Sequence, residues 1–297
     1  MPKFHTVIPI HNVRIGQKVS WKFGAGMELK PVPGWLRGQS MLDNLSSIDR
    51  DAVNEANHAL VTTYPAEALG SPDPASTVKD PRSIQEAKYE VGVLANLALW
   101  LARPSPACFA IVIHAPLFGT SPTVQQTQRC SELLCHPDNV EIRITRRDLP
   151  LAAKLHKSLL KVPRDTAIWT AIRAGWAGLQ MNIETVRCLL FWVAIEALFG
   201  PADGREIKYR LSQRAGLFLG STPAQARSWF QTAKSGYDFR SKIVHGVWNN
   251  EPKATTRMAE AEELFRLAMV RVLERPSLRA RFSSGSRESF LDGLVFG

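Results

Sequence analysis

The hydrophobic pattern of this 297-residue chain changes its period near residue 150, and this change constrains the fold more than any other feature. Before it, short apolar runs such as Cys108–His114 and the alternating Val140–Thr145 are typical of strands. After it, apolar residues recur every three or four positions, as they do in amphipathic helices. The sequence therefore predicts an α+β fold, with a mixed α/β region over residues 1–150 and an all-helical bundle over residues 151–297.

The individual elements follow from the same periodicity and from Gly and Pro punctuation. In the first region we expect strands at residues 4–10 and 19–23, a short polar helix at 46–59, a loop at 70–82 and a long helix at 83–102. In the second region we expect helices at residues 151–160, 166–180, 183–199, 205–219, 223–245 and 254–273.

The composition, with 45% hydrophobic and 22% charged residues, is typical of a globular protein. The longest apolar stretches, Val91–Ala102 and Cys188–Ile195, are shorter than the roughly 20 residues that a membrane helix needs, so we expect no membrane span. Four scattered cysteines do not form a disulfide framework, and the first residues lack the apolar core of a secretory signal. Both observations favour a reducing cytoplasm.

The basic residues are divided unequally along the chain. Residues 1–150 contain 15 Lys/Arg and 14 Asp/Glu, whereas residues 151–297 contain 22 and 13, so nearly all of the net charge of +10 lies in the second half. A basic domain suggests a polyanionic partner such as nucleic acid. The alternative is a basic surface that serves solubility alone.

Metal and cofactor motifs are weak or missing. Cys130, Cys135 and His136 have the chemistry of zinc ligands, but a structural zinc site needs four ligands, and neither Cys108 nor Cys188 has a partner nearby. No phosphate-binding loop, nucleophile elbow or His-Glu-x-x-His pattern occurs in the sequence. We therefore expect neither a metal site nor a cofactor.

The expected helix at 183–199 is apolar on nearly every side from Cys188 onward, and Glu196 is the one charge in that stretch. A carboxylate in such surroundings requires a cationic or hydrogen-bonding partner. On the next helix, Arg214 lies within roughly 20° of the apolar arc and is expected to face inward. A buried pair between Glu196 and Arg214, or a neighbouring arginine, is therefore predicted, with a structural role favoured over direct catalysis.

The expected helix at 223–245 carries two polar residues that flank its apolar stripe. On a regular helix, Arg240 lies at roughly −80° and His245 at roughly +60° from Phe230. Gly246 is a typical residue for the position after a helix, which places His245 in the last turn, where the helix dipole favours an imidazolium. If the stripe packs against a second copy of the chain, both side chains lie at the rim of that interface. The alternative is a histidine that only caps the helix. The stripe consists of Phe230, Ala233, Tyr237 and Val244.

Residues 237–246, with the sequence Tyr-Asp-Phe-Arg-Ser-Lys-Ile-Val-His-Gly, resemble the signature of the HEPN superfamily, in particular its Apea-like branch. The upstream segments 195–200, 209–214 and 217–220 are similar to those of this branch in order and spacing, so the resemblance covers roughly residues 180–275. The family's Arg-x4-6-His motif maps onto Arg240 and His245. Ser241 stands where many catalytic members have Asn, Asp or His.

The resemblance implies an all-helical domain that forms a homodimer in which two Arg/His pairs meet in one cleft. Its catalytic members are metal-independent endoribonucleases, commonly in toxin, abortive-infection and anti-phage systems, where an antitoxin or a phage trigger is a possible partner. Other members only bind RNA or mediate assembly, and Ser241 favours that alternative. The resemblance does not extend to residues 1–150. This α/β region could be a sensor or regulatory module that responds to a trigger, it could bind a nucleotide, or it could simply cover the helical domain.

The candidate site combines these observations. Arg240 and His245 are the expected catalytic residues, for a reaction in which the ribose 2′-OH attacks the adjacent phosphate. The expected supporting residues are Glu196, Arg214, Tyr237 and Ser241, and the expected RNA-binding residues are Arg205, Lys208, Arg210 and Lys242.

Overall fold

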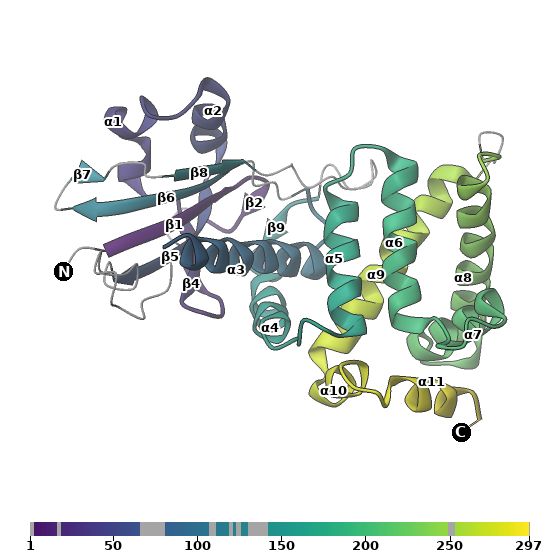
Figure 1. Ribbon diagram of the computed structural model, residues 1–297. Coiled ribbons are helices and arrows are strands. Elements are labelled where there is room, and N and C mark those ends of the chain that lie inside the picture. Colours follow the sequence, from purple (N-terminus) through teal and green to yellow (C-terminus); the bar gives the residue numbers. More distant parts are fainter. Residues whose placement is uncertain are drawn as a thin grey trace. The chain divides into compact units, whose positions relative to one another are not determined.

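The computed structural model describes residues 3–16, 19–65, 81–106, 111–118, 121–122, 126–129, 142–248 and 253–296. The chain divides into two compact units, Met1–Leu160 and Lys161–Gly297, which we call unit 1 and unit 2. An antiparallel sheet is followed in sequence by a helical region, which confirms the predicted α+β class (Figure 1).

Unit 1 contains an antiparallel sheet in which, over the described residues, the strand order is β3-β4-β5-β1-β6-β7, with β8 also paired to β6. At the centre of the sheet, Val7 lies opposite Val61 on one side and Ile113 on the other. A second, parallel pair joins β2 to β9. The strands are β1 Lys3–Ile10, β2 Val13–Arg14, β3 Trp21–Lys22, β4 Met27–Pro31, β5 His58–Pro65, β6 Ile111–Phe118, β7 Ser121–Pro122, β8 Gln126–Arg129 and β9 Ile144–Thr145.

Helices cover both faces of this sheet, as the alternation of side chains along β1 requires (Figure 1). Ile8 points toward α3 (Pro81–Ala102), where it lies directly against Gly92. Val7 points to the other face and packs with residues of η1 (Gly34–Arg37), α1 (Gln39–Leu42) and α2 (Ser47–Glu55).

The boundary between the units lies ten residues beyond the predicted one, because α4 (Leu149–Leu159) belongs to unit 1. His156 on α4 is fully buried and accepts a hydrogen bond at Nδ1 from the Gly24 backbone N–H over 3.1 Å. Its Nε2 lies 3.1 Å from the carbonyl oxygen of Val91 on α3 and therefore donates. This bridge ties α4 to the sheet unit.

In unit 2, the regular elements among the described residues are all helices. Thr166 and Thr222 cap helices by accepting hydrogen bonds from Trp169 N and Gln225 N, which fixes where these helices begin. The core contains large side chains that are almost fully buried, among them Phe191, Trp192, Phe199 and Phe265. The helices are α5 Ala167–Leu179, α6 Glu184–Phe199, α7 Ile207–Leu219, α8 Pro223–Val244, α9 Ala254–Glu274, α10 Pro276–Phe282 and α11 Arg287–Phe296.

The structure confirms the six helices predicted after residue 150 to within two residues at every end, and α3 as well. The helix predicted at 46–59 ends at Glu55, because His58–Pro65 forms β5, which pairs with β1 and β4. Among the elements that were not predicted from the sequence are β4, β5 and the short helices α10 and α11. Residues 70–80 of the predicted loop lie outside the described residues, as do Cys130, Cys135 and His136.

Among the described helices, none combines the length and the hydropathy that crossing a membrane requires.

Candidate functional site

The C-terminal end of α8 has the geometry that the sequence predicts. Gly246 adopts a left-handed φ of +72°, and its N–H donates to the carbonyl of Ile243 over 3.1 Å. The N–H of Val247 donates to the carbonyl of Lys242 over 2.9 Å. These two bonds form a Schellman motif, which a glycine at this position allows without strain. His245 is therefore the C-cap of α8, and its side chain is exposed.

Arg240 lies on α8 five residues before His245 and faces α6. Its Nε is 3.4 Å from Oε1 of Glu196, and its guanidinium carbon lies 5.5 Å from the centre of the Tyr237 ring. The edge of Trp192 packs against the same tyrosine ring, with 5.7 Å between ring centres. Arg240 is thus fixed from two sides, through Nε and through one face of its guanidinium group.

The surroundings of this pair oppose charge on the carboxylate. Burial raises the pKa of Glu196, and the nearby Arg240 cation offsets that rise only in part. Burial, with a further contribution from Glu196, also raises the pKa of the Tyr237 phenol. Oε1 of Glu196 is enclosed but accepts no hydrogen bond from the described residues. Arg240 is therefore the cation that compensates Glu196.

Glu196 pairs with an arginine, as predicted, but this arginine is Arg240, and the predicted pairing with Arg214 is wrong. Arg214 does face inward, with 1% of its side chain exposed, but it pairs with Glu288 and Asp292 of α11. Glu196 is 28% exposed rather than buried, and Arg240 takes the role of its partner. This arrangement was not predicted, because the segment that forms α11, which supplies both carboxylates, has no clear helical pattern in the sequence.

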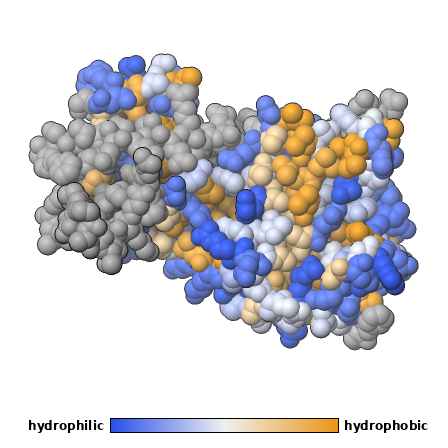
Figure 2. All heavy atoms as spheres, in the orientation of Figure 1, coloured by the Kyte–Doolittle hydropathy of each residue, from blue (hydrophilic) through white to orange (hydrophobic). Residues whose placement is uncertain are grey.

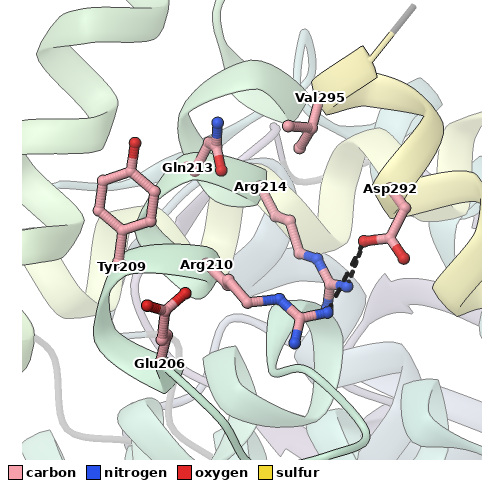
Figure 3. A pocket seen from close by; sticks show the side chains of 7 residues that line it. All are labelled: Glu206, Tyr209, Arg210, Gln213, Arg214, Asp292 and Val295. Carbon is pink, nitrogen blue, oxygen red and sulfur yellow. Dashed lines mark hydrogen bonds and ion pairs between the residues drawn. The ribbon is translucent and has the colours of Figure 1, made fainter.

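Arg214 lines a hollow of about 370 Å³ together with residues of α7 and α11 (Figure 3). Its Nη2 donates to Asp292 Oδ1 over 2.6 Å, and Arg210 beside it donates to both carboxylate oxygens of Asp203. Carboxylates already compensate both guanidinium groups, so this hollow is a poor site for a phosphate. The lining residues are Glu206, Tyr209, Arg210, Gln213, Arg214, Asp292 and Val295.

The four expected RNA-binding residues do not form one surface. Arg210 belongs to the cluster with Asp203 and Glu288. Lys208 instead pairs with Asp238 on α8, over 2.9 Å.

The other two expected RNA-binding residues are exposed. Lys242 lies one helical turn after Asp238 on α8, and Arg205 lies in the loop before α7. Lys208 and Lys242 are therefore near the same part of α8, while Arg210 is directed elsewhere.

Some of the basic residues in the second half of the chain bind carbonyl groups at helix ends. Arg271 donates to the carbonyl of Leu219 at the end of α7 over 3.0 Å. Arg287 donates to three carbonyls at the end of α6. Cations at these positions satisfy carbonyls that lack a helical donor and interact favourably with the helix dipole. The net charge therefore overstates what is available to bind a polyanion.

The apolar stripe predicted on α8 is only partly in the core. Ala233 is buried, Phe230 and Tyr237 are half-buried, and Val244 is 54% exposed. On α6, which packs against α8, Val193 is 44% exposed. Figure 2 shows hydrophobic residues gathered on the face of unit 2 where α5 and α6 lie. We use the term apolar face for Val186, Leu189, Leu190 and Val193 of α6 with Val244 of α8, all at least partly exposed.

No protein-family model, curated protein or solved structure matches this chain. The candidate site therefore rests on its own geometry.

Proposed function

We propose that unit 2 is a metal-independent endoribonuclease of the HEPN type that acts as a homodimer. In this proposal Arg240 and His245 are the catalytic residues, and unit 1 regulates access to them. A cytoplasmic toxin or anti-phage setting, with an antitoxin or a phage signal as trigger, belongs to the same proposal.

The way Arg240 is held is the observation that carries this proposal. Glu196 engages Nε and Tyr237 covers one face, so the two Nη groups have no partner among the described residues. A guanidinium fixed in this way can donate two parallel hydrogen bonds to a phosphate. Electrostatic stabilisation of charge that develops on phosphoryl oxygens is the main requirement of RNA transesterification.

His245 supplies the second requirement, a group that exchanges protons with the ribose 2′-OH and the leaving 5′-oxygen. It is exposed at the C-cap of α8. On a regular helix, five residues separate two side chains by roughly 140°, so Arg240 and His245 of one chain point to different sides. A two-fold dimer over the apolar face, which includes Val244, would bring the two pairs into one groove.

The reaction would proceed without external cofactors. His245 removes the 2′-OH proton, the resulting oxygen attacks the adjacent phosphorus, and the P–O5′ bond breaks with proton return to the leaving oxygen. Arg240 compensates the added charge on the phosphoryl oxygens. The products are a 2′,3′-cyclic phosphate and a 5′-hydroxyl.

The test is cleavage of RNA by the purified full-length chain. Wild type should cleave in excess EDTA and leave 2′,3′-cyclic phosphate ends, and both His245→Ala and Arg240→Ala should abolish cleavage while the melting temperature stays close to wild type. Gln231→Ala, at an exposed position of α8 that is not part of the proposed site, is the matched control and should retain cleavage. If wild type leaves RNA intact, or if His245→Ala still cleaves, the catalytic proposal fails. RNA binding without cleavage would then identify a silent binding module.

A further inference from the structure

The last turn of α6, which carries Glu196, is held by arginines from other helices. Arg287 Nη1 donates to the carbonyls of Ala197 over 2.8 Å and Leu198 over 3.1 Å, and Nη2 donates to the carbonyl of Gly200 over 3.2 Å. Arg214 Nη1 donates to the carbonyl of Phe199 over 3.2 Å. Four consecutive carbonyls therefore receive a donor from a guanidinium group.

These contacts matter because the end of a helix is its weakest part. The last carbonyls have no intrahelical donor, and the last turn unwinds easily when nothing satisfies them. Glu196 adds a carboxylate to this turn, where the helix dipole disfavours negative charge. Two guanidinium cations at the same end offset both effects.

The arginines are fixed in turn by the C-terminal helix. Glu288, the residue after Arg287 on α11, binds the guanidinium group of Arg214 through both carboxylate oxygens. Asp292, one turn further along α11, binds the same guanidinium group. The side chain of Arg287 is 17% exposed, so its contacts are largely shielded from water. One short helix thus supplies Arg287, which contacts the end of α6 directly, and Glu288 and Asp292, which act there through Arg214.

We infer that Arg287 is a positioning residue for the Glu196–Arg240 pair, and that α11 is a required part of the candidate site although it lies apart from it. Arg287 fixes the turn of α6 that presents Glu196, and Glu196 fixes Arg240 through Nε. The importance of Arg287 for cleavage rests on the proposed function. The effect of Arg287 on the geometry of Arg240 is independent of the proposed function.

The experiment uses the full-length chain and two kinds of readout. The first is NMR hydrogen exchange of the Gly200 amide, which donates to the carbonyl of Glu196 over 2.8 Å, and of the Arg240 Nε–H. Arg287→Gln should accelerate both exchanges at least tenfold. The second is single-turnover RNA cleavage, which should fall at least tenfold while the Kd for RNA stays within twofold. Arg287→Lys, which keeps the charge and one donor group, should restore part of both.

Two further variants separate positioning from general stability. Arg271→Gln removes a comparable contact between an arginine and a helix-terminal carbonyl, at Leu219, and should leave both exchange rates and cleavage unchanged. Gly200→Ala disturbs the same turn of α6 without altering α11, because a β-carbon there would lie 2.6 Å from the carbonyl oxygen of Glu196. Gly200→Ala should accelerate the same exchanges and reduce cleavage as Arg287→Gln does. It replaces Arg287→Gln in the test if that variant does not fold.

The outcomes distinguish the two proposals. Unchanged exchange at Gly200 and Arg240 in Arg287→Gln overturns the positioning role, whatever the protein does to RNA. An active wild type whose cleavage is insensitive to Arg287→Gln overturns it as well. Faster exchange in Arg287→Gln, with a wild type that never cleaves RNA, supports the positioning role and rejects the nuclease.

Discussion

Glu196 and Arg240 face each other across α6 and α8 with 3.4 Å between Oε1 and Nε, and burial raises the pKa of the carboxyl in spite of the nearby cation. An acid whose pKa is raised by folding stabilises the folded state below its unfolded pKa and loses that contribution as the pH rises. The folded protein therefore bears a cost at neutral pH to keep Glu196 beside Arg240.

Glu196→Gln removes the charge and keeps the shape. We expect its free energy of unfolding at pH 7 to equal that of wild type or to exceed it by up to about 1 kcal/mol. The substitution removes the desolvation cost of the carboxylate, and the partly exposed ion pair that is lost with it contributes little. Urea titrations at pH 4.5 and pH 7 should show that the free energy of unfolding of the variant, relative to that of wild type, increases as the pH rises. A variant that is several kcal/mol less stable at pH 7 would contradict this account of the pair.

Substitution of Arg214, unlike that of Glu196, should lower the free energy of unfolding. Its guanidinium group is buried and paired with Glu288 and Asp292, so Arg214→Gln removes their nearest cation and leaves the longer contacts from Arg210, at 3.4 and 3.9 Å. We expect a loss of about 3–5 kcal/mol in the free energy of unfolding, measured by urea titration. Arg205→Gln, at an exposed position before α7, is the control and should change it by less than about 0.5 kcal/mol. A small effect at Arg214 would show that the cluster does not stabilise the fold.

Self-association through the apolar face is the third prediction. Val193→Asp and Val244→Asp place a charge on exposed positions of α6 and α8, so neither should unfold the monomer, but each should break an apolar interface. Light scattering should report a dimer for wild type and a monomer for both variants. Ile48→Asp, at a position in unit 1 that is 64% exposed, should remain dimeric. Monomeric wild type at tens of micromolar would refute the dimer.

Two buried histidines predict the acid sensitivity of unit 1. Burial lowers the pKa of His114 and of His156 to about 4, and the N–H of Gly24 donates to Nδ1 of His156, which must therefore be unprotonated. Stability from such groups is complete above the unfolded pKa of about 6.5 and falls as the pH drops toward 4.

Between pH 7 and pH 5 the loss should be about 2 kcal/mol for each of the two histidines. Urea titrations followed by a probe of the sheet unit measure this loss, and His156→Gln should show a smaller one. Ile48→Gln replaces an exposed residue of unit 1 that does not titrate and should keep the full dependence. A stability of unit 1 that does not change across this pH range would exclude the neutral buried state.

Local features of the sequence determined much of the fold. The three- and four-residue spacing after residue 150 predicts helices because burial of one helical face depends only on the positions within that segment. The glycine at 246 ends α8 because a left-handed φ suits it, and Arg214 faces inward because it lies on the apolar arc of its helix. These properties require no knowledge of which helices meet.

The tertiary structure alone decided the partners. Arg214 has the same intrinsic chemistry whether it pairs with Glu196 or Glu288, and the packing of α11 against α7 selects Glu288. Likewise, the packing of α6 against α8 places Glu196 beside Arg240. The same packing leaves Val244 exposed. An ion pair depends on the distance between two charges in space, and residues 74 positions apart carry no sequence periodicity that encodes it.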